Sequence, residues 1–434
     1  MSKKHPYKEI VLPNKLRVLL YPMDSVMSVY AVVYVRVGAI YEKQKERGIS
    51  HFTEHMPFLG TKALPTPLSL SQAADEIGAK YNGITGRFKT EYLIKLPYTN
   101  IGKGVDFLYN FVFEPLNIGK DIEKEKNVIL SEYNDFWHNP DKKFNHEFWR
   151  KRFKQKEHPY SYRALGIPRT IKAFEKNDIL HWREQYYNPA NMILSIAGNI
   201  NEKQLIEKLK TTFGKEKAGT KRKEPKFGSN DYSNFSVFLQ NEPRPQIRFF
   251  VTFPAFGYKQ VSRQKELQLE LLKDILGGSP SSRLYHRLRR KERFVYSAGC
   301  NMNIYPWMGA FYVWGSVPAE KLLPTMKSTK QEIDKVLKTG VTEKEINLSR
   351  KYMAAARLMH FDSPESVAYY FANQVFDEDK IWFPERYIKE AEKVTKEELN
   401  NLAKKIFDYS KVNISLLGNV PDKTLKAVEE IFKV

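Results

Sequence analysis

A short apolar segment occurs twice in this 434-residue chain, and the repeat is the feature that most constrains the fold. Residues 193–200 read Ile-Leu-Ser-Ile-Ala-Gly-Asn-Ile, and residues 413–420 read Asn-Ile-Ser-Leu-Leu-Gly-Asn-Val, at an offset of 220. Each copy reads as a buried strand and is followed by a charged, amphipathic helical pattern. Solenoid repeats are only about 20–50 residues long, so a period of half the chain predicts a duplicated domain.

The repeat divides the chain into two similar halves. We expect an N-terminal domain at 1–214, a polar linker at 215–231 and a C-terminal domain at 232–434. Apolar patterns of both strand and helix period occur, which predicts an α+β fold. We expect strands at 16–21 and 28–37 and helices at 69–77, 118–137, 202–213 and 422–432.

The motif His51-Phe-Thr-Glu54-His55 can hold a metal ion. On a helix the two histidines are one turn apart on the same face, with Glu54 on the neighbouring edge. Neutral imidazoles are good zinc ligands, and a nearby carboxylate that does not bind the metal can act as a base. The order His-x-x-Glu-His is the inverzincin signature. The alternative is an amphipathic helix with two ordinary polar histidines.

A zinc site needs a third protein ligand, and two glutamates downstream are candidates. Glu125 and Glu132 are two helical turns apart, so both face the same way on the helix expected at 118–137. One of them can reach the metal while the other orients the site. The alternative is a solvated face on a lysine-rich helix.

The sequence 48–61 resembles the pitrilysin, insulysin and mitochondrial processing peptidase family. The two glutamates are part of the resemblance: Glu132 follows the histidine motif by about 75 residues, and Glu125 lies seven residues before Glu132. The resemblance spans nearly the whole chain and implies a short, two-domain, bacterial-type member. It implies two homologous α/β-sandwich domains of the mitochondrial processing peptidase type, each a mixed sheet packed by helices. Pro57 departs from the family pattern and should end or bend the helix just after His55.

The resemblance also implies a role for each residue of the motif. His51, His55 and Glu132 would bind zinc, one ion per chain, with Glu54 as the general base and Glu125 as a supporting residue. The chain would then be a zinc metalloendopeptidase acting on oligopeptides. Glu54 would take the proton from the attacking water and deliver it to the leaving amine.

An extended segment at 80–96 has glycines in its first half and a firm strand pattern after it. Glycines in a strand often mark a close backbone approach. The family uses the equivalent strand as an exposed edge on which substrate lies as an added strand. The resemblance therefore implies substrate binding by Asn82, Gly83 and Thr85. Gly83 stands where alanine is usual and Phe88 where glutamate is usual, so the resemblance implies the mode of binding but leaves the subsite preference open.

The second half lacks the histidine motif but contains a basic segment at 276–297. By pattern alone this segment is a glycine turn and a surface helix. The family has an arginine and a tyrosine seven residues apart that bind the substrate carbonyl and backbone, and Arg289 and Tyr296 fit that spacing. Both are suitable donors to an oxyanion. Because long family members bring this pair from their last domain, the resemblance implies a homodimer in which each chain completes its partner's site.

The formal net charge of +21 raises the possibility of a nucleic-acid or anionic-membrane partner. Lysine and arginine are spread through both halves and interleaved with acidic residues, so a charged, solvated surface is the simpler interpretation. The densest patch, 215–226, falls in the expected linker. A positively lined cavity that favours acidic peptides is the other interpretation.

Compartment and partners follow from the remaining features. The single cysteine, Cys300, excludes internal disulfides. No apolar run reaches the roughly 18 residues of a membrane span, and the N-terminus has no hydrophobic region. We therefore expect a cytoplasmic zinc endopeptidase with no nucleic-acid or membrane partner. Two alternatives stay open: a noncatalytic family subunit of a heteromeric assembly, and a nucleic-acid or anionic-surface binder.

Overall fold

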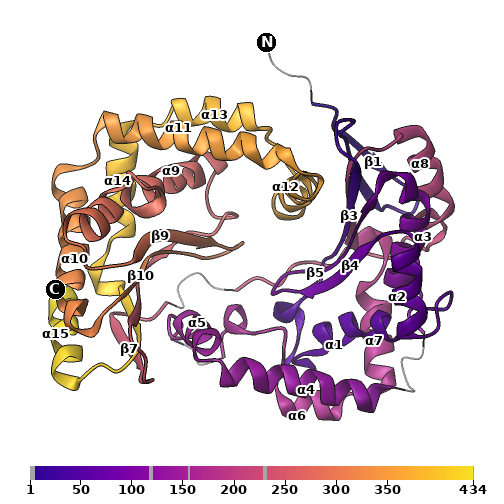
Figure 1. Ribbon diagram of the computed structural model, residues 1–434, viewed down its shortest axis with the longest axis horizontal. Helices are drawn as coiled ribbons and strands as arrows, with labels where there is room; N and C mark the ends of the chain where they lie inside the picture. The colour runs from indigo at the N-terminus through magenta and orange to yellow at the C-terminus, as the bar shows by residue number, and fades with distance from the viewer. Residues whose placement is uncertain (1–4, 117–120, 155–156, 228–231, 434) are drawn as a thin grey trace. The chain divides into compact units, whose positions relative to one another are not determined.

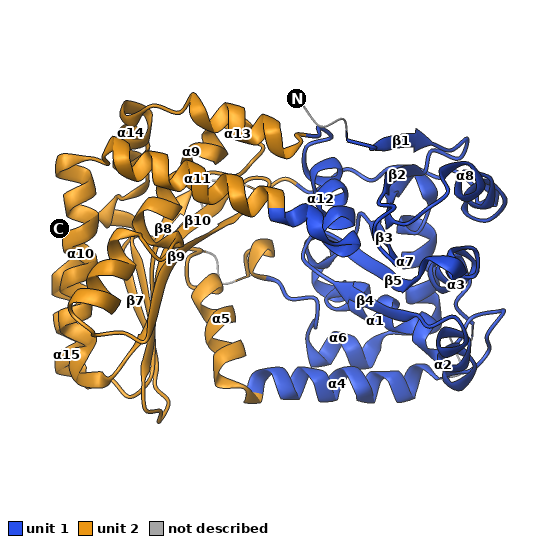
Figure 2. Cartoon of the chain, turned by 45° about the horizontal axis from the view of Figure 1, so that its top comes forward, with its two compact units in different colours: residues 1–137, 162–225, 359–381 blue, residues 138–161, 226–358, 382–434 orange. Residues whose placement is uncertain are grey.

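The computed structural model describes residues 5–116, 121–154, 157–227 and 232–433. The chain divides into two compact units, which Figure 2 shows in blue and orange. Unit 1 consists of residues 1–137, 162–225 and 359–381, and unit 2 consists of residues 138–161, 226–358 and 382–434. Among the described residues, no helix combines the length and apolar character that a bilayer crossing requires.

Unit 1 is built on a mixed six-stranded sheet with the order β1-β2-β6-β3-β5-β4. Neighbouring strands are antiparallel except for the parallel pair β2 and β6. The central strands β3 and β6 are buried on both faces, as their continuous apolar sequences require. The strands are β1 (Lys8–Val11), β2 (Arg17–Pro22), β3 (Ser28–Val35), β4 (Lys80–Thr85), β5 (Thr90–Pro97) and β6 (Met192–Gly198).

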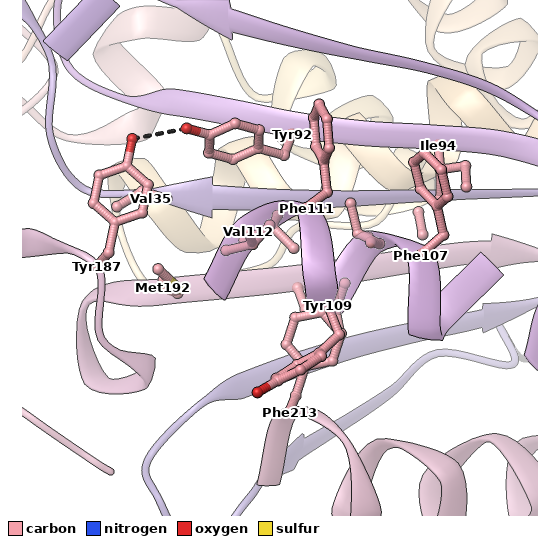
Figure 3. Packing of buried hydrophobic residues seen from close by; sticks show 14 of the residues in the cluster. Val35, Tyr92, Ile94, Phe107, Tyr109, Phe111, Val112, Tyr187, Met192 and Phe213 are labelled. Atoms are coloured by element: carbon pink, nitrogen blue, oxygen red, sulfur yellow. Dashed lines mark hydrogen bonds between the residues drawn. The ribbon is translucent and has the colours of Figure 1, made fainter. Parts of the chain in front are cut away.

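Helices cover one face of this sheet and form the main core of unit 1 with it. Figure 3 shows Phe107 and Phe111 of helix α3 packed against the strand that carries Tyr92. The Tyr92 hydroxyl lies 2.9 Å from that of Tyr187, so each buried phenol has a polar partner. The helices of this part are α1 (Ile49–His55), α2 (Pro67–Glu76), α3 (Ile101–Phe113), α4 (Ile122–His138), α6 (Pro168–Ala173), α7 (Lys176–Tyr186) and α8 (Glu202–Thr211).

The other face of the sheet is covered by a helix from the C-terminal half, α12 (Pro364–Asp377). Side chains alternate along β3, so Tyr30 and Tyr34 lie opposite the main core. The Tyr34 hydroxyl donates to Asn373 Oδ1 at 2.9 Å, and the Tyr30 hydroxyl donates to that of Tyr369 at 3.1 Å. Unit 1 is therefore a three-layer structure whose outer helix comes from far along the chain.

Unit 2 has a five-stranded sheet with the order β7-β11-β8-β10-β9, which repeats the order β2-β6-β3-β5-β4 of unit 1. Its strands are β7 (Ser236–Gln240), β8 (Ile247–Ala255), β9 (Ser297–Ile304), β10 (Gly309–Val317) and β11 (Asn413–Leu417). Its helices are α5 (Pro140–Arg150), α9 (Arg263–Lys273), α10 (Leu322–Thr339), α11 (Glu343–Met359), α13 (Pro384–Glu392), α14 (Lys396–Ile406) and α15 (Asp422–Phe432). Helix α5 comes from the N-terminal half and packs on Phe250 of β8, with Phe144 stacked on that ring and Phe148 tilted against it.

The duplicated α+β architecture is confirmed, with a mixed sheet and covering helices in each unit. The compact units nevertheless differ from the contiguous halves 1–214 and 232–434, because segments 138–161 and 359–381 are exchanged between them. The start of the helix expected at 118–137 and the end of the linker expected at 215–231 lie outside the described residues.

Helix α1 owes its position to its apolar face and to a buried cap. Ile49, Phe52 and Met56, at spacings of three and four, all enter the core of unit 1. The helix is only seven residues long, and a 3₁₀ turn that contains Pro57 (Met56–Leu59) follows it directly, so the helix ends after His55 as expected. Gly48 precedes the helix at a φ of 99°, a left-handed conformation that glycine adopts readily.

The carboxylate of Glu42 accepts hydrogen bonds from two backbone amides at the start of α1. Its Oε2 accepts from Gly48 N at 2.8 Å and its Oε1 from Ser50 N at 2.9 Å. Glu42 thus supplies partners for amides that a helix cannot satisfy internally, although it is six residues upstream. Burial raises the pKa of Glu42 to about 7, against the opposing effect of these two amide hydrogen bonds.

This raised pKa predicts a pH-dependent contribution to stability. The protonated carboxyl stabilises the folded chain below the ordinary pKa of 4.5, and the contribution is lost as the pH rises through about 7. In Glu42→Gln that group no longer titrates. The free energy of unfolding of the natural protein, minus that of the variant, should fall by on the order of 3 kcal/mol between pH 4.5 and 8.

Denaturant unfolding at a series of pH values measures this difference. Glu76→Gln, which removes an exposed carboxyl of the same unit, controls for the change in net charge. The prediction would be contradicted if the difference in free energy of unfolding between the natural protein and Glu42→Gln stayed constant across this pH range.

Candidate metal centre

Two histidines of α1 and one glutamate of α4 converge in unit 1. His51 Nε2 lies 3.2 Å from His55 Nε2, and Glu132 Oε2 lies 3.6 Å and 3.8 Å from these two atoms. All three side chains offer a donor atom within 4.8 Å of the others. In Figures 1 and 2, α1 lies between strand β4 and helix α4. The structure thus brings together the three ligands that the resemblance implied.

This donor set fits zinc. A tetrahedral ion with bonds of about 2.05 Å has ligand atoms about 3.3 Å apart, close to the three separations above. Burial, reinforced by the charge of His55, lowers the pKa of His51 to about 3, so its ring is neutral, as a ligand must be. Two imidazole nitrogens 3.2 Å apart can share one proton, or bind one cation that lies to the side of the line joining them.

Glu125 supports His55 from behind. His55 Nδ1 donates to Glu125 Oε1 at 2.6 Å, which leaves Nε2 directed at the other ligands. Burial acts to lower the pKa of His55, but the hydrogen bond to Glu125 and the charges of Glu54 and Glu132 outweigh it, and the pKa is raised. Carboxylate–histidine pairs of this kind fix the ring orientation in zinc sites and make the ligand more basic.

Glu54 lies beside the three donors and outside their set. Its Oε2 is 3.9 Å from His51 Nε2 and accepts a hydrogen bond from the Thr85 hydroxyl at 3.1 Å. Burial raises the pKa of Glu54 to about 7, opposed by His55 and by the Thr85 hydrogen bond. A carboxylate with a pKa near neutrality is suited to proton transfer at neutral pH.

A pocket of about 570 Å³ opens beside these residues. Asn82, Gly83 and Thr85 of β4 line one side of it. They lie next to His51, His55 and Glu132, the metal-ligand group. β4 is the last strand of its sheet, and among the described residues no strand pairs with its outer edge. A Cβ atom on Gly83 would lie 2.4 Å from Glu54 Oε1, so the absence of a side chain lets the strand approach the carboxylate closely.

Arg289 and Tyr296 lie together in unit 2. The Arg289 guanidinium is 5.2 Å from the centroid of the Tyr296 ring, and Tyr296 is 76% exposed. Arg289 belongs to a π-helical turn, η9 (Tyr285–Lys291), and Tyr296 immediately precedes β9. Because the two residues belong to the other compact unit, their role in substrate binding stays a prediction.

Sequence reasoning missed two parts of the site. Glu42 has no sequence signal, because its link to α1 depends on a loop fold. The segment 162–165 lines the pocket but lies about 110 residues from the histidine motif. Its Tyr162 accepts a hydrogen bond from Gln44 at 3.0 Å and stacks under the Arg47 guanidinium at 3.8 Å, which ties this segment to the loop before α1.

Comparisons with known proteins identify the family of the chain. Residues 17–161 match the family model for insulinase, peptidase family M16, and residues 173–353 match the model for the peptidase M16 inactive domain. An uncharacterised zinc protease of Rickettsia felis is 31% identical over 358 residues, which cover 82% of this chain and 84% of that protein. The uncharacterised zinc protease YmxG of Bacillus subtilis is 26% identical, with 95% and 99% of the two chains covered.

Solved structures show the same fold. A protease from Helicobacter pylori superposes with a TM-score of 0.82 at 21% sequence identity, covering 95% of this chain and all of that one. The extent of the match to the Rickettsia relative, together with the two family models, establishes the family. The chain belongs to peptidase family M16, the insulinase family, whose members similar to it include proteins named as zinc proteases.

Proposed function

We propose that this chain is a zinc-dependent endopeptidase that hydrolyses unfolded oligopeptides inside a dimeric chamber. The observation that carries the proposal is the convergence of His51, His55 and Glu132 at a pocket whose wall is an open strand edge. These three residues would hold one zinc ion per chain. A cytoplasmic location, expected from the single cysteine, is part of the same proposal.

The peptide would lie along β4. An extended chain can add to an open sheet edge through backbone hydrogen bonds, so β4 would accept many sequences and only unfolded ones. Helix α1 contacts β4, and Gly83 lets the peptide pass close to Glu54. The scissile bond would therefore lie beside this carboxylate and the metal-ligand group.

Glu54 would transfer the protons of the reaction. A zinc ion held by the three ligands supplies a Lewis acid that polarises the scissile carbonyl and acidifies water. Glu54 takes a proton from the attacking water and gives it to the leaving amine nitrogen. The Thr85 hydroxyl holds Oε2 in place, while Oε1 faces β4, where the peptide would lie.

Glu54→Gln tests the assignment of the base. The amide has nearly the same shape but cannot accept the proton, so kcat should fall by about 10²–10⁴-fold. Zinc content, measured by elemental analysis, should stay the same, and the cleavage by the natural protein should be abolished by a chelator. His51→Ala should lose both the activity and the zinc. Undiminished hydrolysis by Glu54→Gln would remove Glu54 from this role, and a metal-free natural protein would favour a noncatalytic family subunit.

Glu125→Gln tests the support of His55. The neutral amide accepts the His55 hydrogen bond without making the ring more basic, so zinc affinity should fall by about 10–100-fold. Competition with a colorimetric chelator measures the affinity. Glu123→Gln is a matched control on the same helix, because the Glu123 side chain is 79% exposed. Equal zinc affinity in the two variants would show that Glu125 does not tune the ligand.

The dimer is tested by mixing two inactive chains. If Arg289 and Tyr296 serve the metal centre of the partner subunit, a heterodimer of Glu54→Gln and Arg289→Ala has one complete site. Random mixing should then restore about a quarter of the natural activity. The mixture is unfolded together and refolded before peptide hydrolysis is measured. If the mixture is no more active than the two variants assayed separately, either the arginine and the metal centre act within the same chain, or the arginine is not part of the site.

A further inference from the structure

We propose that Glu42 is a positioning residue for the metal centre, which fixes the start of helix α1 relative to strand β4 before zinc binds. This inference rests on the proposed zinc-peptidase function and adds a residue to it. Glu42 is 5% exposed and lies nine residues before His51. Its carboxylate accepts hydrogen bonds from backbone amides of the helix, so its effect on the metal ligands would pass through the helix itself.

The loop 39–48 is joined to the proposed substrate strand at its start. Two amides of its first turn, η1 (Ala39–Tyr41), donate to the carbonyl oxygens of Gly86 and Arg87 at 3.2 Å and 3.0 Å. These two carbonyls belong to the turn that directly follows β4. Glu42 is the next residue after η1. The side chain that caps α1 is therefore carried by a turn whose backbone is bonded to the end of β4.

The Glu42 carboxylate joins the same loop to the first turn of α1. Its Oε2 accepts from Gly48 N at 2.8 Å and its Oε1 from Ser50 N at 2.9 Å. Ser50 immediately precedes His51, and amides at this end of a helix have no partner within the helix. Because both carboxylate oxygens are engaged, the start of α1 can shift relative to β4 only if a buried hydrogen bond is broken, which is costly.

A second contact restrains the same turn of α1. A Cβ atom on Gly166 would lie 2.5 Å from Gly48 Cα, so the two backbones touch directly. The Thr170 hydroxyl donates to Arg47 O and holds this second segment in place. The start of α1 is thus restrained by a backbone contact and by one carboxylate, and only the carboxylate can be removed without a change in the backbone.

Restraint of the helix should strengthen metal binding. The apparent Kd of a ligand is the intrinsic Kd divided by the fraction of the protein that is already in the binding conformation. Helix α1 has only seven residues and cannot hold that conformation by itself. Loss of a side-chain cap typically shifts helix stability by about five-fold, and loss of two bonds to buried amides should shift it by about ten-fold or more.

Glu42→Ala tests the inference through zinc affinity. Competition with a colorimetric chelator measures the apparent Kd for zinc, at a temperature at which circular dichroism shows every variant to be folded. This Kd should rise by about ten-fold or more. Glu42→Gln keeps one oxygen for one amide but turns an NH₂ donor towards the other, so its Kd should lie between the two. At saturating zinc, kcat of Glu42→Ala should approach that of the natural protein, because excess metal repopulates the ordered helix.

Amide hydrogen exchange of the metal-free protein gives a readout that does not depend on activity. In Glu42→Ala, exchange should become faster in the segment 48–56, which contains α1. Strands β3 and β6 of the same unit should stay protected, because they are buried on both faces. Faster exchange confined to α1 is expected from a positioning role and not from a general loss of stability.

Asn14→Ala is a matched control. Asn14 is 6% exposed, and its Nδ2 donates to the backbone oxygens of Phe213 at 2.7 Å and Glu216 at 3.1 Å. It lies in the turn between β1 and β2, and β1 is at the opposite edge of the sheet from β4. This variant also loses two buried hydrogen bonds to the backbone, so it should lower the stability of unit 1 without changing the zinc Kd.

The possible failures have different meanings. If the natural protein binds zinc and Glu42→Ala binds it equally tightly, the inference is overturned and the peptidase function stands. The same holds if Asn14→Ala weakens zinc binding as much as Glu42→Ala does. Should Glu42→Ala not fold, the comparison of Glu42→Gln with Asn14→Ala decides in the same way. A natural protein that binds no zinc would overturn the proposed function, and the inference with it.

Discussion

The site depends on the short helix α1, which has one apolar face and one polar face. One face of α1 buries Ile49, Phe52 and Met56 in the core of unit 1, and the other presents two imidazoles and a carboxylate to a pocket. Seven residues are too few for a helix to be stable alone, so packing and the Glu42 cap must hold it. The two histidine Nε2 atoms lie 3.2 Å apart, an arrangement that favours a bound cation.

Much of this centre could be predicted from the sequence. Helical spacing places His51 and His55 on one face, and the heptad between Glu125 and Glu132 places both carboxylates toward it. The separate roles of the two glutamates came from the resemblance and stay a prediction. In the structure Glu125 contacts Nδ1 of His55, whereas Glu132 lies beside both Nε2 atoms. The repeat at 193–200 and 413–420 predicted a duplicated domain, and the structure has two sheets that share one strand order.

What the sequence did not reveal depends on contacts between distant segments. The Glu42 cap and the pocket wall at 162–165 have no periodic signal, because each is positioned by a loop. The exchange of segments 138–161 and 359–381 is hidden for another reason. An amphipathic helix shows in its sequence that it covers a sheet, but not which of two similar sheets it covers. The role of Arg289 and Tyr296 stays a prediction, since it concerns how separate parts of the assembly meet.

The exchanged helix α12 also affects how the protein is made. Residues 359–381 cover the face of the first sheet that carries Tyr30 and Tyr34. A ribosome that has released the first 225 residues has therefore delivered every strand of that sheet but not its cover. In the nascent chain this face therefore lacks its native cover until residues 359–381 have been synthesised. Completion of unit 1 is thus tied to translation of residues 359–381, long after its other segments have been made.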